Sequence, residues 1–107
     1  MASTANTARR DRRPQDQRLE ALRKANEIRA RRAQLKRDLA AGAIHIHDVL
    51  AMPPNFAAAE RVAVLLLALP GYGPARVAKL LQRTRIGESR RLAALTDRQR
   101  TELIQHL

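Results

Sequence analysis

Gly71 and Gly73 stand on either side of Tyr72 in the stretch LPGYGPARVAKLL (residues 69–81), and the residue types in this stretch can bind an anion. The Pro-Gly pair predicts a tight turn. Pro74 suits the first position of a following helix, where its fixed φ fits and its missing N–H costs nothing. Both glycines lack a Cβ and can take positive φ, so the turn amides can approach an anion at the positive end of the helix dipole. The spacing therefore predicts a helical hairpin with a phosphate-binding loop.

A row of basic side chains follows this turn. Arg76, Lys79 and Arg83 recur at i, i+3 and i+7, so they share the outer face of the second helix while its apolar residues face inward. Three cations beside such a loop indicate that the anion is the backbone of a nucleic acid. The alternative is an ordinary turn between packed helices with a solvated basic face. Tyr72 also has two interpretations, because it can stack on a sugar or base or plug the hairpin with its ring.

Two further groups of basic residues are candidates for phosphate contacts. Arg29, Arg32 and Lys36 also recur at i, i+3 and i+7, on one face of a long predicted helix. Arg90 and Arg91 are adjacent in a predicted exposed turn, where two guanidinium groups can grip one phosphate. For both groups the alternative is solvated surface charge that contributes little.

The overall charge indicates a polyanionic partner. The chain has 107 residues, with 21 Lys plus Arg against 10 Asp plus Glu and a formal net charge of +11 at pH 7. This excess is typical of nucleic-acid-binding proteins, although it does not choose DNA over RNA. Arginine predominates among the basic residues, which favours bidentate, geometrically defined phosphate contacts.

Several other chemistries are not supported. The chain has no Cys, which excludes a disulfide framework and a thiolate zinc site. His45, His47 and His106 lack metal-ligand spacing, so we expect neither a metal site nor a cofactor. The longest apolar run, residues 62–69, is too short to cross a bilayer, and no hydrophobic segment follows the arginines at 9–13. We therefore expect a cytoplasmic protein.

Catalysis and single-strand binding are also disfavoured. Glycosylases with a helix-hairpin-helix carry a catalytic Asp downstream of the hairpin, and no Asp lies between Pro74 and Arg85. Aromatic residues make up only 2% of the chain, so platforms for stacking single-stranded bases are lacking. The candidate face has no cluster of Asn or Gln to read base edges. We expect a non-enzymatic protein that binds duplex phosphates with little sequence selectivity.

The chain divides into a tail and one small helical domain. Residues 1–14 are polar and Arg-rich without periodicity, which predicts a disordered basic tail. Residues 15–41 contain no Gly or Pro and predict one long basic helix that ends at Gly42. The remainder, 42–107, predicts a compact helical part, so that residues 15–107 form a single DNA-binding domain.

The first half of the compact part contains two expected helices. Residues 44–50 have apolar spacing that suits a short helix before Pro53 and Pro54. Asn55 is the expected N-cap of the next helix, which becomes apolar on nearly every face and ends at Leu69. We expect this helix to be central and the others to pack around it.

The second half contains the hairpin's second helix and a last helix. We expect the former over residues 74–85, followed by a turn at 86–92 in which Ser89 caps a short helical turn. Thr96 and Gln99 have the spacing of a capping box at the start of the last helix. No alternating strand pattern occurs, so the fold class is all-α.

These elements and motifs resemble a known family. Residues 14–107 are similar to the actinobacterial type of integration host factor, on three quoted stretches and the order of elements between them. The stretches are RARRAQLK at 29–36, LPGYG at 69–73 and IGESRRL at 86–92, of which the last is the most specific. The resemblance implies a long N-terminal helix packed on a small helical domain with a helix-two-turns-helix, a motif like the helix-hairpin-helix.

The resemblance also implies a function and partners. It implies a nucleoid-associated architectural protein that binds double-stranded DNA, bends it and affects supercoiling, with a phage integrase or a topoisomerase as a further partner. We expect no membrane partner and a monomer. By position, the resemblance and the basic rows together give the expected DNA-binding residues: Arg29, Arg32, Lys36, Gly71, Tyr72, Gly73, Arg76, Lys79, Arg83, Arg90 and Arg91.

Two positions depart from the family's pattern. Pro74 and Ala93 stand where relatives usually carry basic residues, so this chain lacks two positive contacts and one amide donor. Each lost phosphate contact flattens the slope of log K against log salt by about 0.9. Lys79 and Arg83 can compensate in part.

Two other functions remain open from the sequence. The main alternative is a ribosomal or structured-RNA-binding protein with the same hairpin motif, although such proteins usually carry a long basic C-terminal tail. A third possibility is an adaptor that recruits an integrase or a polymerase.

Overall fold

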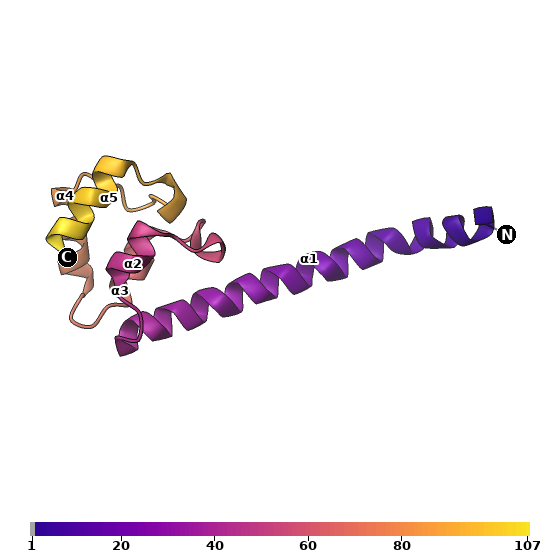
Figure 1. Cartoon of the computed structure of the whole chain (residues 1–107), viewed down its shortest axis with the longest axis horizontal. Helices are drawn as coiled ribbons and strands as arrows, with labels where there is room; N and C mark the ends of the chain where they lie inside the picture. Colours follow the sequence, from indigo (N-terminus) through magenta and orange to yellow (C-terminus); the bar gives the residue numbers. More distant parts are fainter. Residues whose placement is uncertain (1) are drawn as a thin grey trace. The chain divides into compact units, whose positions relative to one another are not determined.

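The computed structural model describes residues 2–107, and it describes side chains from Pro14 onward. Its described residues form helices and no β-strand, which confirms the all-α fold class. One isolated antiparallel bridge joins Arg61 and Arg91. The elements in chain order, labelled in part in Figure 1, are α1 (Ala2–Ala41), α2 (Ile46–Ala51), η1 (Asn55–Ala57), α3 (Val62–Leu67), α4 (Pro74–Arg83), η2 (Leu92–Ala94) and α5 (Asp97–His106).

The chain forms two compact units, and the boundary between them falls inside α1. The first unit ends at Ala30 and the second covers Arg31–Leu107. The last part of α1 therefore belongs to the second unit, where Leu35 and Leu39 are buried in the core. The compact part thus begins before Gly42, because Leu35 and Leu39, near the C-terminal end of α1, are buried in its core.

The helix α1 is longer than the helix predicted for residues 15–41, since it begins at Ala2 and includes Pro14. Residues 2–13 include several good helix formers, and a proline interrupts the backbone hydrogen bonding at one position. The proposed disordered tail at 1–14 stays a prediction, because Met1 and the side chains of residues 2–13 lie outside the described residues.

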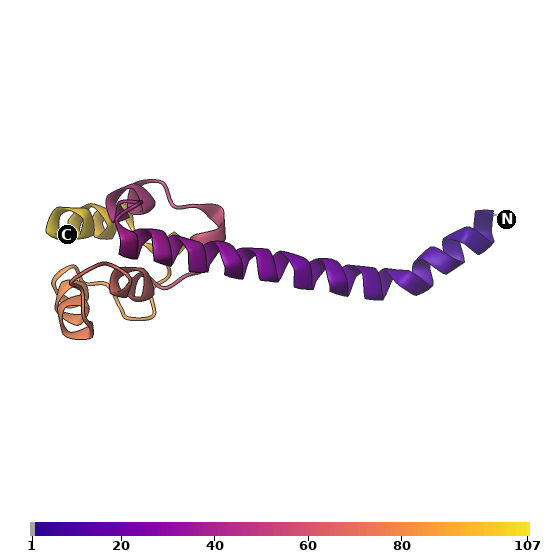
Figure 2. The ribbon, with the colours of Figure 1, turned by 90° about the horizontal axis from the view of Figure 1, so that it is seen from below.

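The core of the second unit is built from the inward faces of its short helices. Helices α3 and α4 pack on each other, and α5 packs on both α2 and α4. Figure 2 shows α2 and α5 on one side of this unit and α3 and α4 on the other. The side chains that fill the centre are aliphatic, with relative exposures of 1% or less: Leu39, Leu50, Ala57, Val62, Leu65, Leu66, Leu92 and Leu103.

The predicted central helix was wrong in its length and its cap. Asn55 begins the short 3-10 helix η1, and α3 starts only at Val62 with Arg61 as its N-cap. The segment between them instead pairs with the chain near residue 91: Val62 N–H donates to Arg90 O, and Leu92 N–H donates to Glu60 O. These long-range bonds satisfy backbone groups that a continuous helix would have satisfied locally.

The elements after the hairpin also differ in detail from the prediction. Helix α4 ends at Arg83, two residues early, and Arg85 has a positive φ of 55°. Ser89 caps nothing, because the helical turn η2 begins at Leu92. The capping box of α5 is confirmed: Gln99 N–H donates to Thr96 Oγ1 at 3.1 Å, and Thr96 N–H donates to Gln99 Oε1 at 3.1 Å. None of the described helices is long and apolar enough to span a membrane.

Candidate nucleic-acid interface

The hairpin between α3 and α4 has the predicted turn, but only one of its two glycines has the positive φ that favours glycine. Gly71 has a φ of +79°, which other residues rarely adopt. Gly73 has a φ of −84° and is the N-cap of α4, so it does not use the positive φ that a glycine can take. Val77 N–H donates to Gly73 O, which begins the α4 ladder. The amides of Ala75 and Arg76 precede that bond and have no partner within the helix.

Arg76 is fixed beside this turn by two contacts. Its guanidinium lies over the Tyr72 ring, 4.0 Å from the ring centroid, and its Nη1 donates to Gly71 O at 3.2 Å. Tyr72 is half-buried and packs against the core, as the hairpin plug is expected to do. Because Arg76 covers one face of the ring, that face cannot also stack on a base. A cation held in place loses less side-chain entropy when it binds an anion.

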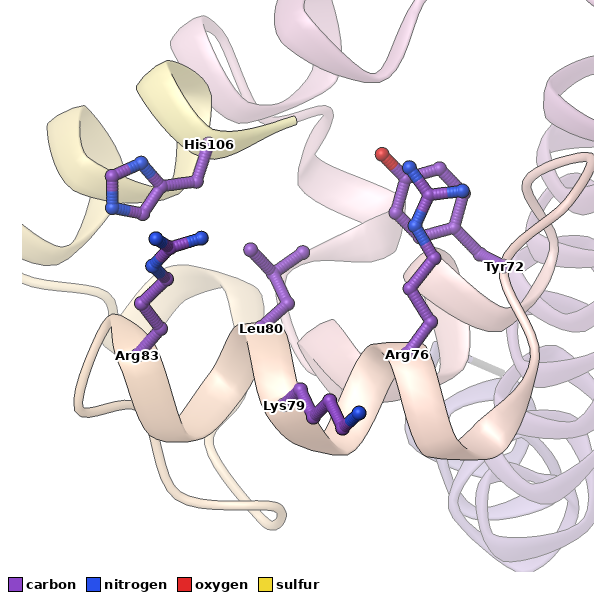
Figure 3. Close-up of a pocket in the computed structure, with 6 residues that line it drawn as sticks. All are labelled: Tyr72, Arg76, Lys79, Leu80, Arg83 and His106. Atoms are coloured by element: carbon purple, nitrogen blue, oxygen red, sulfur yellow. The ribbon is translucent and has the colours of Figure 1, made fainter.

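The three basic residues of α4 border one open pocket of about 220 Å³. Figure 3 shows Arg76 over Tyr72 at one end, Arg83 beside His106 at the other, and Leu80 between them. Arg76, Lys79 and Arg83 are all exposed, and the residues that line the pocket include no acid. In the described part of the chain, no carboxylate forms an ion pair with any of these three cations. The pocket is therefore positive and accessible.

His106 is the lining residue that the sequence did not indicate. It lies in the last turn of α5, more than twenty residues from Arg83 in the chain. No motif links the two positions, because only the packing of α5 on α4 brings them together. From the sequence, His106 was considered only as a metal ligand. Among the described residues there is no group of three or more His, Cys, Asp or Glu side chains that could hold a metal ion.

The predicted row on α1 is not a row of free cations. Arg32 is partly buried, and its Nε donates to Phe56 O at 2.8 Å. Lys36 Nζ lies 3.3 Å from Glu60 Oε2. Arg29 belongs to the first unit, where its Nη1 donates to Asn26 Oδ1 at 3.3 Å. Two of the three side chains therefore have partners inside the second unit.

Arg90 and Arg91 are both exposed, but their guanidinium groups have separate partners. Arg90 Nη1 donates to Ala94 O at 3.2 Å, and Arg91 Nη1 donates to Ala59 O. Arg91 also takes part in the bridge to Arg61 with an extended backbone, at φ −89° and ψ 154°. The two guanidinium groups therefore bond to different parts of the chain.

The contacts of Arg32, Lys36 and Arg91 converge on one short stretch, residues 56–60, which we call the tethered segment. These side chains bond Phe56 O, the Glu60 carboxylate and Ala59 O, respectively. The amide of Ala93 adds a bond to Ala58 O in the same stretch. Because the segment has little regular structure, its carbonyl groups need such donors. Arg32, Lys36 and Arg91 therefore stabilise this segment of the fold.

Comparisons with known proteins agree with this architecture. Residues 39–107 match the family model of the S13-like H2TH domain. Over 92 residues, the chain is 36% identical to the integration host factors of Mycolicibacterium smegmatis and Mycobacterium tuberculosis, covering 84% of this chain and 88% of each relative. It is 34% identical over 86 residues to the integration host factor of Streptomyces coelicolor, covering 78% of this chain and 80% of that protein.

A solved structure gives the same result in three dimensions. The structure of sIHF bound to an 8-bp palindromic DNA matches with a TM-score of 0.73 and 30% sequence identity, covering 78% of this chain and 97% of that one. Fold, motif and sequence thus agree over most of the chain, and the chain belongs to the integration host factor family.

Proposed function

We propose that this protein binds double-stranded DNA through its phosphates, with the face of α4 and the hairpin turn as the principal contact. It acts as a non-enzymatic architectural protein of the nucleoid. Effects on supercoiling, on topoisomerases or on integrase-mediated recombination follow from its occupancy of DNA. The site residues of this proposal are Arg76, Lys79 and Arg83, with the turn at Gly71 and Gly73.

The observation that carries the proposal is the positive pocket on α4. Three exposed cations line it without an acidic side chain, and one of them is held in place beside the turn. The first-turn amides of α4 and the helix dipole add favourable potential for an anion near Arg76. A linear polyanion can contact the turn and the basic row together, which a single small anion cannot.

Relatives support DNA as the polyanion. The matching solved structure is a complex with an 8-bp DNA, and the curated relatives are named integration host factors. In the pocket, the polar contacts come from Arg and Lys side chains and from one Tyr and one His. Contacts to phosphates supply affinity and position but not sequence information. We therefore expect low sequence selectivity.

A salt titration tests the proposal. Duplex affinity is measured by fluorescence anisotropy between 50 and 300 mM KCl for the parent and for a triple variant, Arg76→Gln, Lys79→Gln and Arg83→Gln. We expect the slope of log K against log salt to flatten by about 0.9 for each cation that contacts a phosphate. Arg98→Gln is the control, because Arg98 is exposed, pairs with Glu102 and lies outside the pocket. An unchanged slope in the triple variant removes this face from the interface.

Competition separates DNA from RNA as the preferred polyanion. A duplex DNA and a structured RNA of equal length compete for the protein at one salt concentration. Stronger competition by the RNA contradicts the proposal and supports a ribosomal or structured-RNA-binding role.

Bending is the part of the function that requires a second contact surface. Bending a site of 20–30 bp costs on the order of 1 to 6 kcal/mol, which further phosphate contacts must offset. Arg90 is exposed and is our candidate for that surface in the second unit. Arg29, in the first unit, is a separate candidate. Energy transfer between labels at the two ends of a 25-bp duplex should rise on saturation with protein. An unchanged transfer efficiency rules bending out.

A further inference from the structure

The end of the pocket that is farther from the hairpin turn has its own composition. There Arg83, from the last turn of α4, lies beside His106, from the last turn of α5 (Figure 3). We propose that Arg83 and His106 form a second phosphate subsite, which a DNA backbone occupies most strongly when His106 is protonated. The inference rests on the proposed DNA binding and adds to it a proton-linked regulation.

The two ends of α4 can contact different phosphates. Arg76 and Arg83 are seven residues apart, which corresponds to roughly 10 Å along a helix that rises 1.5 Å per residue. Leu80 is buried between them and offers no polar group to an anion. Duplex DNA carries about one charge per 1.7 Å of its axis, so both ends of the pocket can be in contact with phosphates at once.

The side chains at the second end have no internal anionic partner. In the described part of the chain, neither Arg83 nor His106 takes part in a side-chain hydrogen bond or an ion pair with an acid. Both are exposed. This distinguishes Arg83 from Arg32 and Arg91, which are bonded to backbone carbonyl groups. A guanidinium and an imidazole that share one open space can donate to the same anion.

The charged groups around His106 are mostly basic. The polar residues of α4 and the hairpin that line the same pocket are Arg76, Lys79, Arg83 and Tyr72. On α5 itself, Glu102 is paired with Arg98. Helix α2, which packs on α5, carries His47 and Asp48, and neither lines the pocket. Leu107 follows His106 in the chain and carries no charged side chain.

The sign of the proton linkage follows from this arrangement. A protonated His106 beside Arg83 is a pair of like charges, and an anion between them reverses that repulsion. Binding of a phosphate at this subsite therefore takes up a proton. By linkage, affinity for the duplex must rise as the pH falls.

The test measures duplex affinity against pH. A labelled 20-bp duplex is titrated with the full chain at pH 5.5, 6.5, 7.5 and 8.5 at constant ionic strength. For the parent, we expect affinity to be roughly two- to fivefold higher at pH 5.5 than at pH 8.5, the range given by one exposed ionic contact. His106→Gln should remove this dependence and keep the affinity that the parent has at high pH. Arg83→Gln should weaken binding at every pH.

Matched controls separate this site from other titrating groups. His45→Gln and His47→Gln should leave the pH dependence unchanged, and a chain extended by Gly-Ser after Leu107 should do the same. If the parent has no pH dependence, or His106→Gln retains it, the inference is overturned while the proposed function stands. If no variant and no condition gives duplex binding, the proposed function itself fails.

Discussion

Two rows of basic residues have the same spacing along their helices, but their side chains have different surroundings. Arg29, Arg32 and Lys36 recur at i, i+3 and i+7 on α1, and Arg76, Lys79 and Arg83 recur identically on α4. The row on α4 lines an open pocket without acidic residues. In the other row, Arg32 and Lys36 are bonded to the tethered segment.

This difference shows that helical periodicity identifies a basic face of a helix but does not indicate what that face binds. Periodicity places cations on one side of a helix and says nothing of what packs there. On α1, a segment rich in carbonyl groups packs against that side. On α4, the Tyr72 ring and the end of α5 with His106 approach that side, and neither residue is acidic. A guanidinium that satisfies a partly buried carbonyl stabilises the fold, whereas an exposed guanidinium such as that of Arg76 can still bind an external phosphate.

The largest expected effect is on stability and comes from Arg32. Arg32→Met keeps an apolar stem but removes the donor to Phe56 O, and we expect the free energy of unfolding to fall by about 1 to 2 kcal/mol. Urea unfolding followed by circular dichroism measures it. Arg31→Met is the matched control, because Arg31 is exposed and its guanidinium lies 6.0 Å from the centroid of the Phe56 ring. Duplex affinity lost in Arg32→Met without loss of stability would show that Arg32 contacts DNA instead.

Arg76 should show the opposite behaviour. For Arg76→Met we expect about tenfold weaker duplex binding and a salt slope flatter by about 0.9, because one charge-assisted phosphate contact is lost. The free energy of unfolding should change by less than about 1 kcal/mol, since the contacts of Arg76 are exposed. Equal losses of stability and affinity would erase the distinction between the two rows.

Tyr72 sharpens the comparison, because it acts through Arg76. Tyr72→Leu keeps an apolar plug and removes the aromatic face under the guanidinium. We expect roughly threefold weaker duplex binding, since the cation must be ordered on binding, with the salt slope unchanged. Isothermal calorimetry at two salt concentrations measures both. A flatter slope would mean that the Tyr72 variant has lost the phosphate contact itself.

The smallest effect is expected at Lys36. Its side chain is 38% exposed, and that of Glu60 is 14% exposed. Partly exposed ion pairs contribute about 0 to 1 kcal/mol, so Lys36→Met should lower the free energy of unfolding only slightly. Thermal unfolding at low and high salt tests this, since the loss should shrink when salt screens the pair. A large fall in duplex affinity would instead indicate that Lys36 contacts DNA.

Much of the fold could be predicted because its signals are local. The turn at Gly71, the start of α4 at Pro74 and the capping box at Thr96 each depend on a few adjacent residues, and all were found in the structure. The errors have a common cause as well. Asn55 is a good N-cap by type, but the backbone beyond it bonds to Arg90 and Leu92, which lie about thirty residues away.

Composition and spacing by themselves predicted a polyanionic partner and one half of the candidate site. The net charge of +11 is a sum over the residues, and the glycine turn before a basic row depends on a few adjacent residues. Both can therefore be read from the sequence. Only the tertiary structure decided which cations bond to the tethered segment and which remain available to an external anion. It also decided that His106 joins Arg83. Both outcomes depend on contacts between residues distant in the chain, which no local pattern encodes.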